Sequence, residues 1–231
     1  MSVSGENGSF FVVLDLEMCK VQRISQDYGR KMEIIQIGAV LLNEDFDKVN
    51  EFDRYVKPSF GYIDRYIHKL TGIKNSDVAK ASDLETVLCE FEDWIPDNTA
   101  NIISWSMTDK NQLYGEMRAK GIHCDSLEKM NEKWIDCQLN FSERMNNQRR
   151  YSLEEALIAA DIFSIGKAHN GLIDACNTAL LYAKMCKEHD FQLNPYYKKA
   201  HEYEENHRSH LSYSIGEMLL GLNLNFNYVS C

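Results

Sequence analysis

The sequence contains no run of about 20 apolar residues, only three prolines in 231 residues, and no CxxC pair among its seven cysteines. Without such a run, no helix is expected to cross a membrane. The first residues, MSVSGENGSFF, also lack the basic and apolar segments of a secretion signal. The odd number of cysteines is typical of reduced thiols rather than of a disulfide framework or a zinc ribbon. We therefore expect a cytoplasmic protein without a membrane partner.

Positive charge is also scarce, because 25 Lys and Arg residues stand against 35 Asp and Glu residues, a net charge of −10. This balance excludes a protein that coats nucleic acid by bulk positive charge, so a polyanionic substrate would need a local basic surface. The hydrophobic fraction of 44% is that of a globular protein, and the length suits one α/β-sized unit.

Apolar runs predict the strands and the helices. Strands are expected over 10–18, 34–42, 48–56 and 101–106. One helix is expected from a capping box at Ser82–Glu85 to a stop at Pro96, and another from a capping box at Ser152–Glu155. Further helices are expected over 109–120 and over 173–187; in the second, one apolar face would comprise Cys176, Ala179, Leu180, Ala183 and Cys186. The predicted elements begin with strands and continue with alternating strands and helices. This order favours an α/β fold with a mixed sheet.

The end of the chain has a different character. We expect a main domain over 1–187 and a C-terminal extension over 188–231, which packs either on the same domain or on a partner subunit. The sequence leaves both arrangements, and the oligomeric state, open. His201, His207 and His210 lack a metal-binding spacing, so a solvated helical face is the interpretation for them.

Two carboxylates stand in the first apolar strand. Asp15 and Glu17 are two residues apart, and because side chains alternate along a strand, both project from the same face. Unpaired carboxylates on a buried strand must be protonated, hydrogen-bonded or bound to cations, and carboxylates select hard ions such as Mg²⁺ or Mn²⁺. A strand end at which both groups reach solvent is the alternative for this pair taken alone.

Two further segments place acidic residues or a histidine beside helix starts. Asp109 follows the strand NIISWS, where helix capping alone would also explain a carboxylate. His169 and Asp174 lie in AHNGLIDACNTA, where a helix begins. Taken singly, each has an ordinary structural explanation as a capping group or a surface side chain.

Together these segments resemble the DEDDh 3′–5′ exonucleases, the DnaQ-like branch of the ribonuclease H-like fold. In that family a strand carries DxE, as at Asp15-Leu16-Glu17; an Asp follows a later strand with an apolar residue four positions on, as at Asp109 and Leu113; and HxxxxD opens a helix, as at His169 and Asp174. The segment HKLTGI at 68–73 resembles a further family segment. The resemblance covers residues 8–187 and implies a mixed five-stranded sheet with helices on both faces.

Within this family the sequence is most similar to the exonucleases that trim histone messages and small interfering RNAs, and to bacterial sporulation-inhibitor relatives. Animal members often carry the second acidic residue earlier, within SWDM, where this chain has Ser106. Bacterial relatives tend to place it where Asp109 stands. We therefore assign Asp109 to the second motif.

The resemblance implies a metal-dependent 3′–5′ exonuclease that releases nucleoside 5′-monophosphates from single-stranded nucleic acid, with RNA favoured. It implies two divalent cations, Mg²⁺ or Mn²⁺, held by Asp15, Glu17, Asp109 and Asp174, with His169 as the general base. A histidine, with an ordinary pKa of about 6.5, can accept a proton near neutral pH. The alternatives are a DNA-directed exonuclease of the proofreading or repair type and a catalytically idle module that binds nucleic-acid ends.

Substrate contacts are predicted near these motifs. Met18 and Trp105 adjoin the first two motifs and are expected to stack on, or wedge against, the terminal nucleotide, and Lys69, Leu70 and Thr71 belong to HKLTGI. Residues 54–80 carry six basic side chains and two acidic ones, interleaved with Tyr55, Phe60, Tyr62 and Tyr66. This composition suits phosphate contacts and base stacking. A solvated loop whose aromatic rings turn into the core is the alternative.

Overall fold

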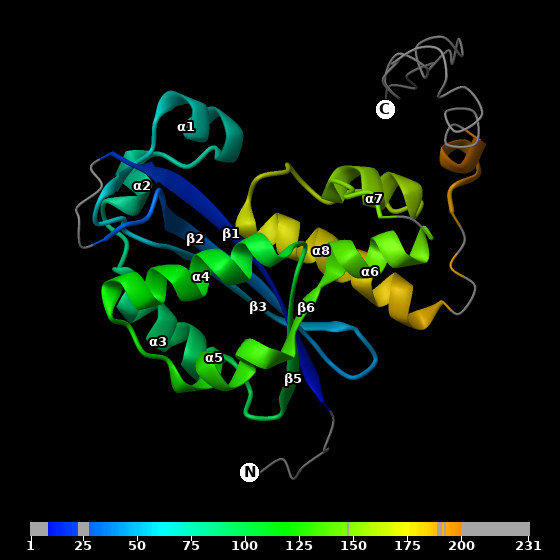
Figure 1. Ribbon diagram of the computed structural model, residues 1–231, viewed down its shortest axis with the longest axis horizontal. Helices are drawn as coiled ribbons and strands as arrows, with labels where there is room; N and C mark the ends of the chain where they lie inside the picture. The colour runs from blue at the N-terminus through cyan, green and yellow to red at the C-terminus, as the bar shows by residue number, and fades with distance from the viewer. Residues whose placement is uncertain (1–8, 23–27, 147, 189–190, 192, 200–231) are drawn as a thin grey trace, which may run out of the picture.

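A mixed sheet forms the centre of the computed structural model, which describes residues 9–22, 28–146, 148–188, 191 and 193–199 (Figure 1). Within these residues the strands are β1 (Phe10–Val21), β2 (Met32–Leu42), β3 (Lys48–Tyr55), β4 (Gly61–Tyr62), β5 (Thr99–Ser104) and β6 (Trp134–Asp136). The order is β3-β2-β1-β5-β6, and β4 pairs with the end of β1. β1 is antiparallel to β2 and parallel to β5, so the predicted mixed sheet is confirmed, with its first strand in the centre.

The sheet has one more strand than the five expected, because the two-residue β4 adds to the five-stranded path. Four of these strands were predicted from the sequence. The other two, β4 and β6, have only two and three residues, which are too few to show an alternating pattern.

Helices cover both faces of the sheet, as expected (Figure 1). They are α1 (Arg65–Thr71), α2 (Asn75–Val78), α3 (Leu84–Trp94), α4 (Met107–Lys120), α5 (Asp125–Met130), α6 (Cys137–Arg144), α7 (Leu153–Ala159) and α8 (Gly171–Lys187), and residues 195–199 are helical as well. Alternation along β1 sends Val12 to the core beneath α3, α4 and α5, and Val13 to the core beneath α6, α7 and α8.

The two predicted capping boxes have different outcomes. At α7 the prediction is confirmed, since Ser152 accepts from the N–H of Glu155 and the Glu155 side chain accepts from the N–H of Ser152. At α3 the prediction is wrong by one residue: Asp83, not Ser82, caps the helix, and its carboxylate accepts from the N–H of Thr86 at 2.9 Å.

The apolar face predicted for α8 is right for Ala179, which is buried in the core, but wrong for two other members. Leu180 is 41% exposed and Cys186 is exposed, whereas Ala175, Tyr182 and Met185 are buried. α8 has apolar side chains around much of its circumference, so periodicity alone does not identify the inward side. The contact of its first turn with the sheet decides the rotation instead.

The six described cysteines are free, and three of them, Cys19, Cys124 and Cys137, are buried. The histidines at 201, 207 and 210, and most of the extension over 188–231, lie outside the described residues. Among the helices that the structure describes, none has the length and apolar character needed to traverse a bilayer.

Candidate active site

The first motif lies on the central strand. Asp15 and Glu17 are both on β1, which β2 flanks on one side and β5 on the other. Glu17 is 8% exposed and Asp15 is partly exposed, so this is not a strand end at which both groups reach solvent. The sheet therefore holds two carboxylates close to its core.

Asp109 joins this pair from α4. β1 pairs with β5 only as far as Val13, and beyond that point the N–H of Leu16 donates to Asp109 Oδ1 at 3.3 Å. Asp109 is 6% exposed and lies in the first turn of α4. Ser106 is instead the N-cap of that helix, where its hydroxyl accepts from the N–H of Thr108 at 3.3 Å. Of the two positions considered for the second motif, the fold thus brings the carboxylate of Asp109 to β1.

The third motif closes the cluster from α8. Asn170 caps the helix, and the N–H of His169 donates to Asp174 Oδ2 at 2.8 Å. His169 is exposed and has a positive φ of 65°, a conformation in which histidine is several-fold enriched among side chains other than glycine. Ligand atoms of Glu17, His169 and Asp174 lie within 4.8 Å of one another. Three segments that are distant in the sequence therefore meet at one place.

Two residues of β2 hold the start of α8 against the sheet, and neither was predicted from the sequence as a site residue. The buried Gln36 accepts from the N–H of Gly171 at 3.1 Å and donates to Asp53 Oδ1 at 2.7 Å. A Cβ at Gly38 would lie 2.0 Å from the backbone of Gly171, so only glycine fits there. The signal in the sequence was a polar residue and a glycine inside the apolar run IIQIGAVLL.

Burial and mutual repulsion favour the protonated forms of the four acids. Burial, then Asp174 and Asp109, raise the pKa of Glu17 to about 8, and burial raises that of Asp109 to about 7. Burial and the three other carboxylates raise the pKa of Asp15 well above its ordinary value, and burial raises that of Asp174. In the described part of the chain, no Lys or Arg forms an ion pair with any of the four. A bound cation would supply the missing positive charge.

The donor set fits hard divalent cations. Carboxylate oxygens are the ligands that Mg²⁺ and Mn²⁺ prefer, and Asp15, Glu17, Asp109 and Asp174 are the residues that could hold such ions. The geometry brings together Glu17 and Asp174 directly, and it joins Asp109 to β1 through Leu16. The chemistry of these side chains is therefore that of a metal site.

The five residues predicted to contact substrate have different surroundings. Met18 is half-buried against the core beneath α4, and Trp105 is half-buried against the opposite core, 6.3 Å from the ring of Phe141. In α1, Lys69 is exposed and Leu70 is partly exposed. Thr71 is 7% exposed, and its hydroxyl donates to the carbonyl of Ile67 and accepts from the N–H of Ile73. That hydroxyl is therefore already used within the fold.

Known proteins resemble this chain over most of its length. The exonuclease family named RNase T matches residues 12–182. ERI1 exoribonuclease 2 of zebrafish (Danio rerio) is 28% identical over 208 residues, which cover 80% of this chain and 36% of that protein. DNA polymerase III subunit epsilon of Aquifex aeolicus is 29% identical over 182 residues, which cover 77% of this chain and 81% of that protein. The chain thus spans about a third of the zebrafish relative's length.

A solved structure gives the same fold. The nuclease domain of 3′hExo, a DEDDh family member bound to rAMP, superposes with a TM-score of 0.69 at 20% identity. The match covers 83% of this chain and 98% of that domain. The resemblance inferred from the three motifs is therefore confirmed. Because the family match extends across nearly the whole described fold, this chain belongs to the RNase T family of exonucleases.

Proposed function

We propose that this chain is a 3′–5′ exonuclease that removes nucleoside 5′-monophosphates one at a time from single-stranded nucleic acid, with RNA as the preferred substrate. The observation that carries the proposal is the convergence of Asp15, Glu17, Asp109 and Asp174 beside the exposed His169. Within the described ranges these carboxylates have no Lys or Arg partner, and burial without such a partner is costly unless cations bind.

Exonucleases of this family use divalent metal ions. We infer that the four carboxylates hold two of them, Mg²⁺ or Mn²⁺, because roughly four negative charges would balance two divalent cations. When bound, such cations lower the pKa of a water molecule and stabilise the departing 3′ oxygen. The buried position of the carboxylates keeps that charge in a medium of low dielectric constant, where its effect on a phosphodiester is largest.

We infer that His169 acts as the general base. It is exposed in the loop before α8, its backbone N–H donates to Asp174, and a ring nitrogen lies within 4.8 Å of carboxylate oxygens of Glu17 and Asp174. The hydrogen bond fixes the backbone of His169 beside a carboxylate of the cluster. From there the ring can accept the proton of the attacking water without serving as a metal ligand.

The preference for RNA is supported by the relatives named exoribonucleases. A DNA-directed exonuclease is the second candidate, because the chain also resembles a DNA polymerase subunit. We further propose that residues 1–187 form the catalytic domain and 188–231 an extension to it.

The test compares four substrates in Mg²⁺ and in Mn²⁺: single-stranded RNA, single-stranded DNA, a blunt duplex and an oligonucleotide blocked at its 3′ end. We expect stepwise release of 5′-monophosphates from the free 3′ ends, fastest on RNA, and resistance of the duplex and of the blocked strand. Internal cleavage of the blocked strand would make the enzyme an endonuclease. Binding without any metal-dependent release would identify an idle end-binding module.

A further inference from the structure

Aromatic side chains are exposed at the end of β1. Tyr62 in β4 is 49% exposed and Tyr66 in α1 is 64% exposed, so neither ring turns into the core. The solvated-loop alternative, in which these rings pack inward, is therefore wrong for both. Exposed aromatic rings offer flat surfaces on which the bases of a single strand can stack.

Lys20 connects the two rings into one surface. It lies opposite Tyr62 in the antiparallel β1–β4 pair, where facing side chains are neighbours. Its Nζ lies 5.7 Å from the centre of the Tyr66 ring and 3.9 Å from Asp64 Oδ2. We call Lys20, Tyr62 and Tyr66 the Lys20 patch.

The Lys20 patch and the carboxylate site share strand β1. Lys20 follows Glu17 by three residues on β1. This separation corresponds to about 10 Å of strand, or about three stacked nucleotides. A single-stranded nucleic acid whose 3′ end lies at Glu17 could therefore contact the Lys20 patch with the nucleotides just upstream of that end.

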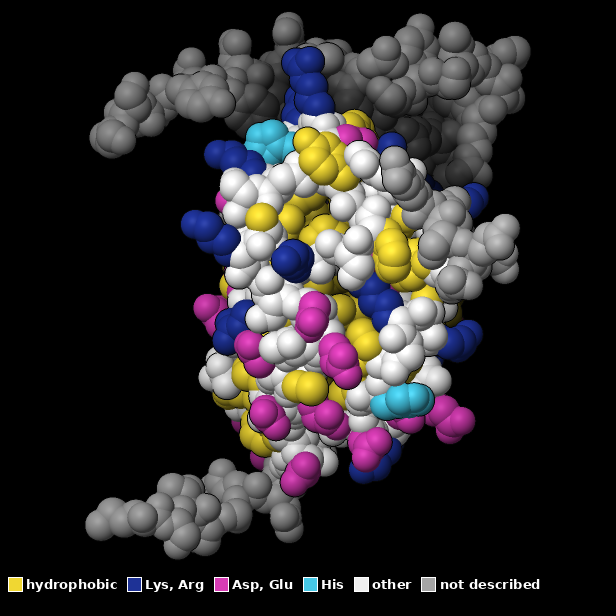
Figure 2. Space-filling view, turned by 90° about the vertical axis from the view of Figure 1, so that its left-hand side faces the viewer, with side chains coloured by type: hydrophobic (Ala, Val, Ile, Leu, Met, Phe, Trp, Pro, Cys, Tyr) yellow, Lys and Arg dark blue, Asp and Glu magenta, His cyan; other side chains and the backbone are white. Residues whose placement is uncertain are grey.

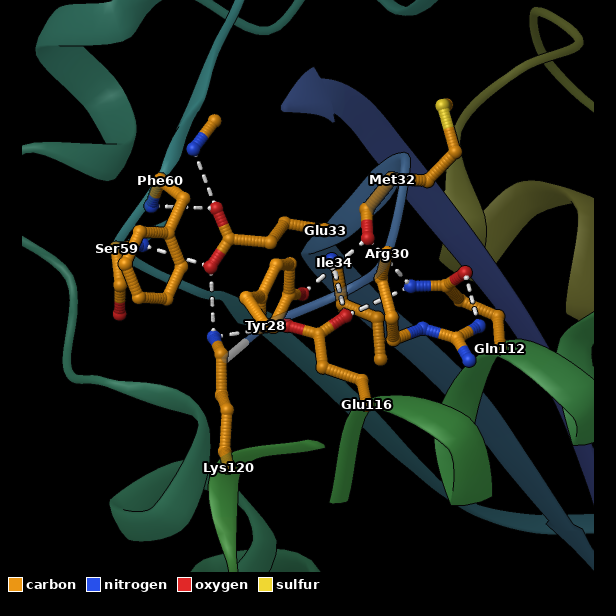
Figure 3. A network of polar contacts seen from close by, with 11 residues as sticks. Tyr28, Arg30, Met32, Glu33, Ile34, Ser59, Phe60, Gln112, Glu116 and Lys120 are labelled. Carbon is orange, nitrogen blue, oxygen red and sulfur yellow. Dashed lines mark hydrogen bonds and ion pairs between the residues drawn. The ribbon is translucent and has the colours of Figure 1, made fainter. Parts of the chain in front are cut away.

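A buried network holds this part of the chain in place (Figure 3). Glu33 is fully buried and accepts from the backbone N–H groups of Ser59, at 2.9 Å, of Phe60, at 2.7 Å, and of Gly61. Lys120 lies 2.8 Å from the same carboxylate. These contacts fix the segment that leads into β4, and a surface fixed in advance loses little conformational entropy on binding.

Close packing limits the position of β4 further. A Cβ at Gly61 would lie 2.3 Å from Cys19 Sγ, so β4 approaches β1 as closely as a glycine allows. Beneath α1 and α2, Cys19 belongs to a small separate core with Ile63 and Ile67. The Lys20 patch thus stands on a packed base.

Charge around the Lys20 patch favours a polyanion. Although the whole chain has a net charge of −10, Lys and Arg gather in the upper part of the face in Figure 2, toward α1 and α2, and Asp and Glu in its lower part. α1 adds the exposed Arg65 and Lys69. Aromatic rings beside cations are the combination that binds single strands without regard to sequence.

We propose that the Lys20 patch binds the bases and phosphates of the single strand upstream of the 3′-terminal nucleotide. Tyr62 and Tyr66 supply the stacking surfaces, and Lys20 supplies the charge. The inference rests on the proposed exonuclease function and adds to it a subsite that selects longer, unpaired strands.

The experiment compares a single-stranded 12-nucleotide RNA with the p-nitrophenyl ester of thymidine 5′-monophosphate, which is too small to reach the Lys20 patch. The quantity measured is the ratio of kcat/KM for the RNA to kcat/KM for the ester. In Tyr62→Ala and in Tyr66→Ala this ratio should fall about 5-fold or more, the range found when a stacking ring is removed. Tyr196→Ala is the control, because Tyr196 is 73% exposed in the segment beside α7 and should leave the ratio as in wild type.

A second readout is independent of turnover. A 4-thiouridine placed two or three nucleotides from the 3′ end should cross-link to the peptides that contain Tyr62 or Tyr66. Unchanged ratios in both variants, or cross-links confined to other peptides, would overturn the inference while leaving the exonuclease function intact. Failure of the wild-type chain to hydrolyse either substrate would instead contradict the proposed exonuclease function itself.

Discussion

Gln36 lies directly opposite Glu17 in the β1–β2 pair, and its side-chain oxygen accepts from the N–H of Gly171. One residue of the sheet therefore adjoins the first motif and also fixes the start of α8, which carries the third. The relative position of Glu17 and Asp174 depends on this contact.

Replacing Gln36 with leucine should slow catalysis without unfolding the chain. Leucine is close in size but accepts no hydrogen bond from Gly171, so the start of α8 can shift. Misplacement of a site by about 1 Å can cost as much as 100-fold in rate, and we expect kcat to fall about 10-fold or more. Asp53→Asn is the control, since asparagine still accepts from Gln36 Nε2. A kcat within 2-fold of wild type in folded Gln36→Leu would refute this role.

Removal of the imidazole should separate catalysis from metal binding. In His169→Ala we expect turnover to fall about 100-fold or more, as general-base contributions predict, with Mn²⁺ affinity close to wild type by calorimetry. Asp15→Asn should lose both turnover and Mn²⁺ affinity. His123→Ala, which removes a histidine that is 85% exposed, is the control. If His169→Ala loses Mn²⁺ affinity as Asp15→Asn does, the histidine is a ligand and not the base.

In EDTA the protein should become less stable as the pH rises. The pKa of Glu17 is raised to about 8 in the folded chain and that of Asp109 to about 7, whereas both titrate near ~4 when unfolded. The native state then holds protons that the unfolded state has released. The stabilisation of the native state by these protons is complete below pH ~4 and is lost as the pH rises toward about 8. Over that range the free energy of unfolding falls by up to about 1.4 kcal/mol per pH unit for each group.

Thermal unfolding in EDTA from pH 5 to 8 measures this effect. Glu17→Gln removes one titrating group, so its Tm should decline less than that of wild type. Asp45→Asn, which alters an exposed carboxylate, should follow the wild-type curve. Equal slopes in Glu17→Gln and wild type would contradict the raised pKa of Glu17.

Divalent cations should restore, at pH 7.5, the stability that the chain loses in EDTA as the pH rises. At a Mn²⁺ concentration of 100 times Kd the gain is about 2.7 kcal/mol, or a rise in Tm of roughly 5–10 °C for a chain of this size. Asp109→Asn keeps an acceptor for Leu16 but removes the charge, and it should abolish most of the rise. Ser106→Ala should lower the Tm through loss of the helix cap yet keep the rise. The reverse pattern would transfer the second motif to Ser106.

Lys120→Met should destabilise the fold. Lys120 lies 2.8 Å from Glu33 and 2.9 Å from Glu116, and both carboxylates are fully buried. Removing the cation leaves them without a counter-charge, at a cost of about 3–5 kcal/mol in urea unfolding. Lys48→Met breaks a surface pair with Glu51 and should cost under about 1 kcal/mol. Similar losses in both variants would contradict the role of Lys120.

Local features of this protein could be predicted from its sequence alone. The 10–18 run predicted a buried strand because nearly all its residues are apolar, and the Ser152–Glu155 pair predicted a helix start because that cap is made by residues three apart. Asp15, Glu17, His169 and Asp174 could be picked out as a set because their order and spacing are local patterns.

Tertiary structure decided the features that depend on contacts between distant segments. Asp109 meets Leu16 across 93 residues of chain, because β1 and β5 separate and leave a backbone N–H for a carboxylate. Gln36 meets Gly171 across 135 residues, and this contact sets which side of α8 faces the sheet. No short segment of the sequence encodes these contacts between distant residues, because each contact depends on the packing of several elements at once.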